Sequence, residues 1–165
     1  MTRTPDGTWT PTPTGGDLVV RRAFRAPIED VWASVTESER TARWFGPWKG
    51  DGRPGGTIQI QLVQEEGAPW SEARIEVCDA PRRLSVTTSD AAGSWHLELL
   101  LTSTGGGTEL RLVHHLTTAD GIGEVGPGWE FYLDALVASR SPDDTPMPDF
   151  TDYYPSMQAY YRSLA

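Results

Sequence analysis

The feature that most constrains this chain is an alternation of apolar and polar residues that recurs through its middle. It is present in the segments 57–63, 70–78, 83–88, 95–101 and 108–116. Alternation with a period of two is typical of half-buried β-strands. The links QEEGAP, DAPR, SDAAGS and TSTGGG are rich in turn-forming residues and too short for a crossover helix. Consecutive strands are therefore predicted to be antiparallel neighbours in one sheet.

The two faces of this predicted sheet differ in polarity. One face carries the apolar residues Ile58, Ile60, Leu62, Ile75, Val77, Leu84, Val86, Trp95, Leu97, Leu99, Leu110 and Leu112. The opposite face carries Glu72, Arg74, Glu76, Glu98 and Arg111. Such a sheet has one wet side and one covered side. The cover is predicted at 129–140, whose helical stripe consists of Trp129, Tyr132, Leu133, Leu136 and Val137.

A first strand and two short helices are predicted ahead of this series. The strand lies at 18–24, and a helix follows over 26–36. Pro27 suits the first turn of that helix, and Glu29 and Asp30 suit its positive end. Its inward stripe is predicted to consist of Val31, Trp32 and Val35.

The second short helix leads into an aromatic loop. Thr36 and Glu39 have the T-x-x-E spacing of a capping box, which predicts a helix that begins at Thr36 and runs toward Trp44. The loop then places Trp44, Phe45 and Trp48 among glycines, prolines and charges. Exposed aromatic rings cost solubility, so we expect the fold or a ligand to cover them.

Three parts are expected along the chain. Residues 1–17 are rich in threonine, proline and glycine, which predicts a flexible tail. Residues 18–140 contain all the periodic segments and are predicted to form the domain. Residues 141–165 begin with a proline-broken acidic linker and end in a tyrosine-rich segment with helical spacing, which predicts a helical extension.

Composition restricts the partners. The 165-residue chain has a net charge of −9, so we expect neither nucleic acid nor an anionic membrane as a partner. It contains no apolar run of the kind found in signal peptides or membrane spans, and a cytoplasmic location is expected. A single cysteine, Cys78, agrees with a reducing compartment. Because no spacing of metal-ligand residues recurs, no metal or cofactor is expected.

Two histidines lie in the last predicted hairpin. Matching Leu99 to Leu110 and Leu97 to Leu112 places Trp95 opposite His114. His114 is then expected on the covered face and His115 on the wet face. Adjacent strand residues point in opposite directions, so these two side chains cannot chelate one metal ion. A structural role for His114 is preferred to ligand contact, and ligand contact to acid-base catalysis, because no carboxylate on the apolar face is evident as its partner.

An ordered series of segments resembles a known superfamily. The series is RRAFRAPIEDVWASVTESERTARWFGP, DGRPGGTI, DAPRRLSV, LRLVHHL and GWEFYLDAL. Over about residues 18 to 140 it resembles the START-like (SRPBCC) superfamily, in the branch of the activator of the heat-shock chaperone ATPase. The resemblance implies an α+β helix-grip fold, in which a curved antiparallel sheet wraps around a long C-terminal helix and two short helices close one end. The extension at 141–165 exceeds the usual domain, and 1–17 is too short for the activator's additional N-terminal domain.

The resemblance also implies an apolar cavity between the sheet and the long helix. Carried onto this chain, the lining is expected to consist of Trp44, Phe45, Trp48, Trp95, Leu97, Leu112, His114, Trp129, Tyr132 and Leu133. We expect this cavity to bind a small hydrophobic or aromatic ligand without catalysis, and the same residues as a filled core are the structural alternative.

Two further functions stay open at this stage. One is a polyketide aromatase or cyclase that uses His114 as its acid or base. The other is chaperone regulation or another protein-interaction role, including homodimerisation through Tyr153, Tyr154, Tyr160 and Tyr161.

Overall fold

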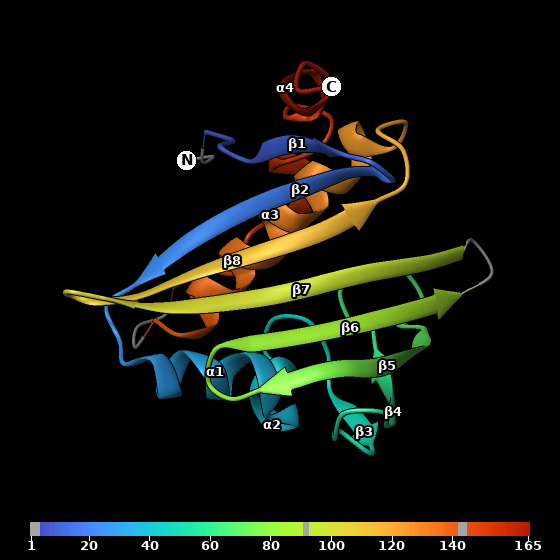
Figure 1. Cartoon of the computed structure of the whole chain (residues 1–165). Coiled ribbons are helices and arrows are strands. Elements are labelled where there is room, and N and C mark those ends of the chain that lie inside the picture. The colour runs from blue at the N-terminus through green and yellow to red at the C-terminus, as the bar shows by residue number, and fades with distance from the viewer. Residues whose placement is uncertain (1–3, 91–92, 142–144) are drawn as a thin grey trace.

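A curved sheet of eight antiparallel strands wraps around a long helix in the computed structural model (Figure 1). The structure describes residues 4–90, 93–141 and 145–165. The strand order is β1-β2-β8-β7-β6-β5-β4-β3. The strands are β1 (Thr8–Thr12), β2 (Gly15–Phe24), β3 (Trp48–Gly50), β4 (Thr57–Gln61), β5 (Trp70–Asp79), β6 (Arg83–Asp90), β7 (Gly93–Thr104) and β8 (Gly107–Leu116). The helices are α1 (Ile28–Thr36), α2 (Ser38–Thr41), α3 (Ile122–Ser139), the 3₁₀ turn η1 (Phe150–Asp152) and α4 (Gln158–Arg162).

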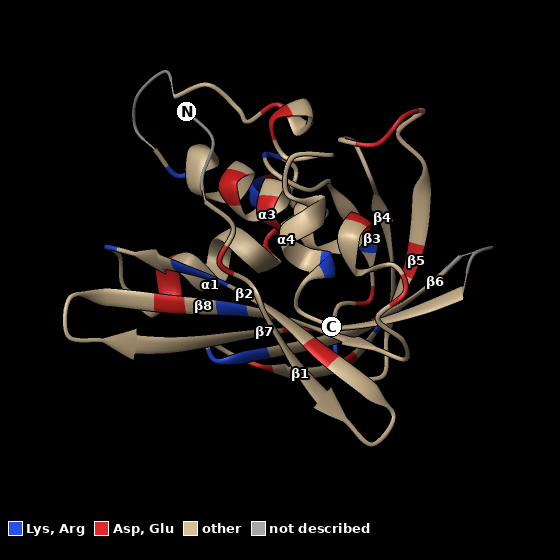
Figure 2. Ribbon diagram, turned by 90° about the horizontal axis from the view of Figure 1, so that it is seen from above, with Lys and Arg blue, Asp and Glu red and all other residues tan. Residues whose placement is uncertain are grey.

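This architecture is the α+β helix-grip fold that the sequence predicted. All five strands of the predicted series are present as β4 to β8, and each pairs with its neighbour in antiparallel fashion. Seen from above, α3 and α4 lie on the same side of the sheet (Figure 2). None of the helices in the described ranges is both long and apolar enough to cross a membrane.

The long helix begins earlier than its apolar stripe indicated. α3 starts at Ile122 and contains Pro127, although glycine and proline favour a loop over 121–128. Tertiary packing explains the difference, because a Cβ atom at Gly126 would collide with the ring of Tyr161 from α4. The small residues that lower helix propensity therefore let the C-terminal extension approach the helix backbone.

The N-terminal segment corrects a prediction. Residues 8–17 were expected in a flexible tail, but they form β1 and the start of β2. β1 pairs with β2, with Trp9 opposite Leu18. The hydroxyl of Tyr160 also donates a hydrogen bond of 2.8 Å to the carbonyl oxygen of Gly7. Composition alone did not reveal this order, because β1 pairs with the adjacent β2, which is itself held by β8, and because the distant α4 bonds to Gly7.

The C-terminal tyrosines pack within their own chain. Tyr161 and Tyr153 are buried, with exposed fractions of 0% and 5%. This packing removes most of the tyrosine surface through which homodimerisation was considered.

The predicted capping box does not form. Thr36 is the last residue of α1, and its hydroxyl donates to the carbonyl oxygen of Trp32 at 2.8 Å. Glu37 occupies the N-cap of α2 without a side-chain cap, and α2 ends at Thr41. A threonine in the last turn of one helix can bond back to that helix, and this contact replaces the cap.

Two details of strand pairing also differ from the prediction. Leu97 lies opposite His114, and Leu99 lies opposite Leu112. The expected pairing is thus shifted by two residues, which leaves every side chain on its predicted face. β5 contains a bulge, so that Val77 pairs with Ser85 on the outer face and Cys78 turns toward the inner face. The assignment of Val77 to the apolar face was therefore wrong.

Candidate functional site

The inner face of the sheet holds a cavity of about 160 Å³, which we call the apolar cavity. Aliphatic strand residues form most of its wall, namely Ile58, Ile60, Ala73, Ile75, Leu84, Val86, Leu97, Leu99 and Leu112. Four aromatic residues also border it, namely Trp44, Phe45, Trp48 and Trp129. An engineered protein cavity of about 150 Å³ binds benzene, whereas drug-sized ligands need roughly 300–1,000 Å³. The apolar cavity therefore has room for one ring or a short alkyl chain.

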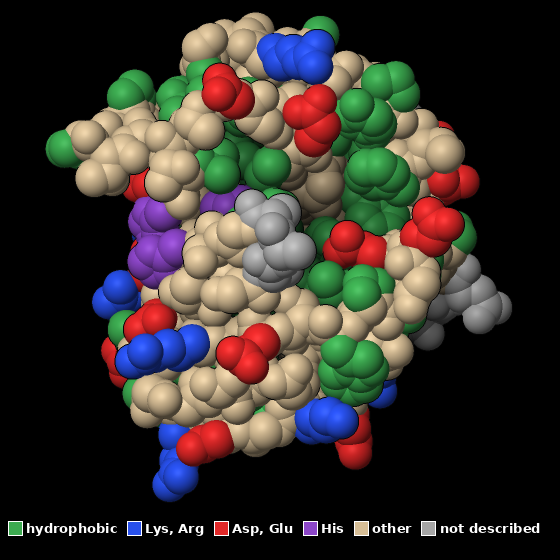
Figure 3. Space-filling model, turned by 90° about the vertical axis from the view of Figure 1, so that its right-hand side faces the viewer, with side chains coloured by type: hydrophobic (Ala, Val, Ile, Leu, Met, Phe, Trp, Pro, Cys, Tyr) green, Lys and Arg blue, Asp and Glu red, His purple; other side chains and the backbone are tan. Residues whose placement is uncertain are grey.

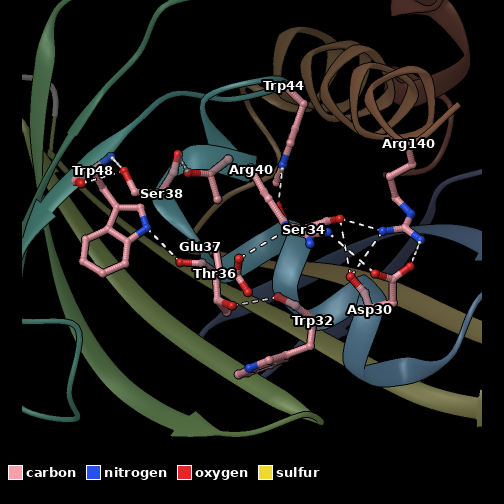
Figure 4. A network of polar contacts seen from close by, with 11 residues as sticks. Asp30, Trp32, Ser34, Thr36, Glu37, Ser38, Arg40, Trp44, Trp48 and Arg140 are labelled. Carbon is pink, nitrogen blue, oxygen red and sulfur yellow. Dashed lines mark hydrogen bonds and ion pairs between the residues drawn. The ribbon is translucent and has the colours of Figure 1, made fainter. Parts of the chain in front are cut away.

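Two tryptophans of the aromatic loop are held by the end of α1. The indole Nε1 of Trp44 donates to the carbonyl oxygen of Ser34, and that of Trp48 donates to the carbonyl oxygen of Thr36, both at 2.9 Å (Figure 4). These carbonyls lie in the last turn of the helix, where intrahelical donors are missing. The indoles thus satisfy the helix terminus while their rings border the apolar cavity.

The rest of the loop is fixed by short polar contacts. Ser38 Oγ donates to the carbonyl oxygen of Trp48 and accepts from its backbone N–H, both at 2.8 Å (Figure 4). Thr41 Oγ1 donates to the carbonyl oxygen of Gly46 at 2.8 Å. At Gly46 a Cβ atom would collide with the backbone of Gln61, so this position requires glycine. The loop is therefore a built wall of the cavity.

Aromatic rings from the loop and from α3 pack together beside the cavity. The rings of Phe45 and Trp129 stack at 6.5 Å with an interplanar angle of 7°. Tyr132 lies 4.8 Å from Phe45 and 5.8 Å from Trp129, measured between ring centroids. Burial, and then the nearby Glu65, raises the pKa of Tyr132, so its phenol is neutral. Figure 3 views the molecule from the end at which the β6–β7 hairpin lies. Hydrophobic side chains gather around a hollow on this face.

His114 supports this aromatic group from the sheet. It is buried, with 1% of its surface exposed, and its Nδ1 accepts a hydrogen bond of 3.1 Å from Trp129 Nε1. Desolvation, followed by the nearby His115 and His96, lowers the pKa of His114 to about 4. The ring is therefore neutral near pH 7, with its proton on Nε2. In the described part of the chain no carboxylate is hydrogen-bonded to it.

His115 lies on the outer face, as predicted. Its Nδ1 is 2.6 Å from Asp17 Oδ1, and its Nε2 is 2.7 Å from Glu98 Oε2. Burial alone would lower the pKa of His115, but its hydrogen bonds to Glu98 and Asp17 raise it. No group of three or more His, Cys, Asp or Glu among the residues described is arranged to hold a metal ion.

The structure brings six of the ten predicted lining residues to the wall of the apolar cavity. These six are Trp44, Phe45, Trp48, Leu97, Leu112 and Trp129. His114 and Leu133 are buried outside the wall, and the ring of Tyr132 contacts that of Phe45 in a tilted arrangement. Trp95 is 39% exposed and lies beside His114, with ring centroids 4.8 Å apart.

Sequence reasoning missed the part of the wall that comes from β4, β5 and β6. Its residues include Ile58, Ile75 and Val86, whose alternation already placed them on the apolar face. Cys78 also lines the cavity, and only the bulge in β5 brings it there. Burial and then the neighbouring Asp79 raise the pKa of its thiol.

Comparison with known proteins agrees with this fold. The family model of "Activator of Hsp90 ATPase homolog 1-like protein" matches residues 25–139. The chain belongs to this family. Within it, the START-like assignment made from the sequence is confirmed. No curated protein matches the chain significantly.

Solved structures with a similar fold cover 84% or more of this chain. The crystal structure of CalU16 from Micromonospora echinospora is 29% identical, covers 98% of this chain and 96% of CalU16, and has a TM-score of 0.77. The protein of gene BPP1335 from Bordetella parapertussis is 20% identical over 98% of this chain and 92% of its own, with a TM-score of 0.73. DynU16, a protein of the dynemicin biosynthetic locus, is 18% identical over 84% of this chain and 50% of its own, with a TM-score of 0.67.

Proposed function

We propose that this START-like domain binds a small hydrophobic or aromatic molecule in the apolar cavity, without catalysing its conversion. The observation that carries the proposal is an apolar void of about 160 Å³ bordered by four aromatic residues. Gaps larger than a water molecule are few in close-packed interiors, so a partly open apolar cavity of about 160 Å³ provides space for a ligand. Its wall is apolar enough that water gains little there, whereas a ring gains contact on several sides.

The size of the void sets the expected affinity. Small ligands gain at most about 1.5 kcal/mol per non-hydrogen atom, so a ring of about six atoms reaches about 9 kcal/mol at best. Dissociation constants from millimolar to micromolar are therefore expected for single-ring probes. A polycyclic ligand exceeds the cavity volume of about 160 Å³.

The geometry around His114 favours binding over catalysis. The Nδ1 atom is occupied by Trp129, and a pKa of about 4 makes the ring a weak base near pH 7. A general base needs an orienting partner and a pKa near the working pH. His114 is therefore a positioning residue, which fixes the Trp129 indole beside the cavity.

A size series of probes tests the proposal. Benzene, indole and naphthalene are titrated into the wild-type protein by NMR, and benzene is expected to shift the methyl signals of Leu97 and Ile75. The variant Ala73→Leu adds three carbon atoms to the wall, because Ala73 is 4% exposed and borders the void. It is expected to abolish benzene binding while the protein stays folded.

The matched control is Ala23→Leu, which adds the same atoms on the exposed outer face of β2. This variant is expected to bind benzene as the wild type does. Equal binding by both variants, or no binding by the wild type at millimolar benzene, would refute a ligand-binding cavity.

A further inference from the structure

A second cavity, of about 260 Å³, lies where α1 meets the C-terminal end of α3. Its lining includes three arginines, Arg40, Arg43 and Arg140, and one carboxylate, Asp30. We call it the arginine site. Figure 4 shows Asp30, Arg40 and Arg140 converging beside Ser34. No residue lines both this site and the apolar cavity, so its function is separate from the one proposed above.

Arg140 is held rigidly and keeps one edge of its guanidinium unused. Nη1 donates to the carbonyl oxygen of Asp30 at 3.2 Å and to Ser34 Oγ at 2.6 Å, and Nη2 donates to Asp30 Oδ2 at 2.8 Å. The guanidinium also lies over the ring of Phe24, 5.6 Å from its centroid. Three of its five N–H groups are thus used, which leaves Nε–H and one Nη2–H on the same edge. The two N–H groups on that edge are spaced so that they can donate to two oxygens of one oxyanion.

Together with Arg140, the other two arginines carry more positive charge than the described carboxylates around them neutralise. Arg40 Nε is 3.3 Å from Glu37 Oε1, and Arg40 Nη1 is 3.6 Å from Asp30 Oδ1. Arg43 is exposed, and it makes no side-chain hydrogen bond or ion pair within residues 4–90, 93–141 and 145–165. Among the residues that the structure describes, three guanidiniums face the carboxylates of Asp30 and Glu37, which leaves an excess of one positive charge. This excess stands out in a chain whose net charge is −9.

Two serines of the site reduce the negative potential at the C-terminal end of α3, which would repel an anion. Ser139 Oγ donates to the carbonyl oxygen of Leu136 at 2.7 Å, and Ser141 Oγ donates to that of Val137 at 3.2 Å. These carbonyls carry the partial negative charge of the helix C-terminus. Because hydroxyl groups cover them, an anion beside the arginines meets less repulsion.

We propose that the arginine site binds the phosphate group of a small phosphomonoester. Donors from separate arginines suit a tetrahedral group with several oxygens better than a carboxylate with two. A bound water molecule needs about 10–15 Å³ by the same measure of volume. A cavity of about 260 Å³ therefore has room for a phosphate group and for an organic group attached to it.

Binding of phosphate compounds at constant ionic strength tests this proposal. Phenyl phosphate, inorganic phosphate and acetate are titrated separately into the wild-type protein and followed by calorimetry. Phenyl phosphate is expected to bind at least as tightly as inorganic phosphate, and acetate at least tenfold more weakly than either. Equal affinity for acetate, a preference for bare phosphate, or no binding of either phosphate compound would overturn the assignment.

The variant Arg43→Gln locates the bound group. Arg43 has no described partner to lose, so the fold is expected to be unaffected, and phenyl phosphate is expected to bind about tenfold more weakly, as for the loss of one charge-assisted hydrogen bond. The control Arg21→Gln removes an exposed arginine from the outer face of β2 and is expected to change the affinity less than twofold. Equal weakening by both variants would mean non-specific attraction and would contradict the proposal.

Discussion

Two parts of the sheet are covered in different ways on their inner faces. One part consists of β2 and β8, and the other of β4, β5 and β6. The first pair packs against α3 and α4, with Leu18, Leu110, Leu133 and Tyr161 fully buried, and we call this region the packed half. The second group borders the apolar cavity, and we call it the cavity half. Among the residues described, its buried core consists of Ile58, Ala73 and Ile75. We infer that the packed half supplies the stability that lets the cavity half keep a void.

Buried ionic contacts are the clearest sign of this division. In the packed half, Arg22 is 4% exposed, and its Nη2 and Nε lie 3.1 Å from Glu130 Oε2 and 2.9 Å from Asp134 Oδ1. Tyr161 and Tyr153 of the C-terminal extension donate to these carboxylates, each at 2.7 Å. The extension thus seals a polar network from water. The cavity half depends on apolar contacts and on indole hydrogen bonds to α1.

The largest effect is expected from breaking this network at Arg22. Arg22→Met leaves the fully buried carboxylate of Glu130 without its cation, which is expected to lower the free energy of unfolding by about 3–5 kcal/mol. Urea denaturation measures the change. Arg21→Met alters the neighbouring residue on the exposed face and is expected to stay within about 0.5 kcal/mol. Similar losses in both variants would contradict the importance of the network.

The pH dependence of stability is expected to report on His114, at the border of the two halves. Its folded pKa of about 4 lies below the usual 6.5, so the unfolded state binds more protons between these values. The contribution of His114 to the free energy of unfolding is therefore complete above pH 6.5. It is lost as the pH falls toward 4, and the loss is roughly 3 kcal/mol at about 1.4 kcal/mol per pH unit.

His114→Gln isolates this effect, because glutamine can still accept from Trp129 Nε1 but does not titrate. Urea denaturation measures the free energy of unfolding at pH 6.5 and at pH 4.5. The decrease between these pH values is expected to be smaller for the variant than for the wild type. Identical decreases would mean that His114 titrates normally in the folded protein.

A smaller effect is expected from single hydroxyl groups of the extension. Tyr161→Phe removes the donor to Glu130 in a buried position and is expected to cost about 1.5–3 kcal/mol. Tyr160→Phe removes a donor to the neutral carbonyl of Gly7 and is expected to cost about 0.5–1.5 kcal/mol. Thermal and urea denaturation should keep this order. A reversed order would mean that the hydrogen bond of Tyr161 to Glu130 is not the main polar contact of the extension with the packed half.

The smallest effect is expected where a void already exists. Ala73→Leu fills the apolar cavity and is expected to change the free energy of unfolding by less than about 1 kcal/mol. Ala135→Leu adds the same atoms to α3, where Ala135 is 0% exposed, and is expected to cost about 1–3 kcal/mol by overpacking. Equal costs in the two variants would remove the distinction between the halves.

Much of the fold could be predicted because strand side chains alternate with a period of two. This period placed Leu97, Leu99 and Leu112 on the inner face and His115 on the outer face. It could not distinguish registers that differ by two residues, and so Leu97 lies opposite His114 instead of Leu112. A bulge changes the period itself, which explains why Val77 and Cys78 exchange faces.

The candidate site could be predicted in outline only. The aromatic loop with Trp44 and Trp48 was recognisable from its composition, whereas its attachment to the last turn of α1 depends on hydrogen bonds between distant atoms. The arginine site had no signal in the sequence, because Arg40 and Arg140 come together only when α1 meets the end of α3.

The sequence by itself determined which side chains face inward, since alternation and helical periodicity are local properties of the backbone. Only the tertiary structure decided how completely those side chains fill the interior, because packing depends on residues that are far apart along the chain. For that reason Gly7, next to β1, is held by Tyr160 of α4, and a void remains beside Ala73.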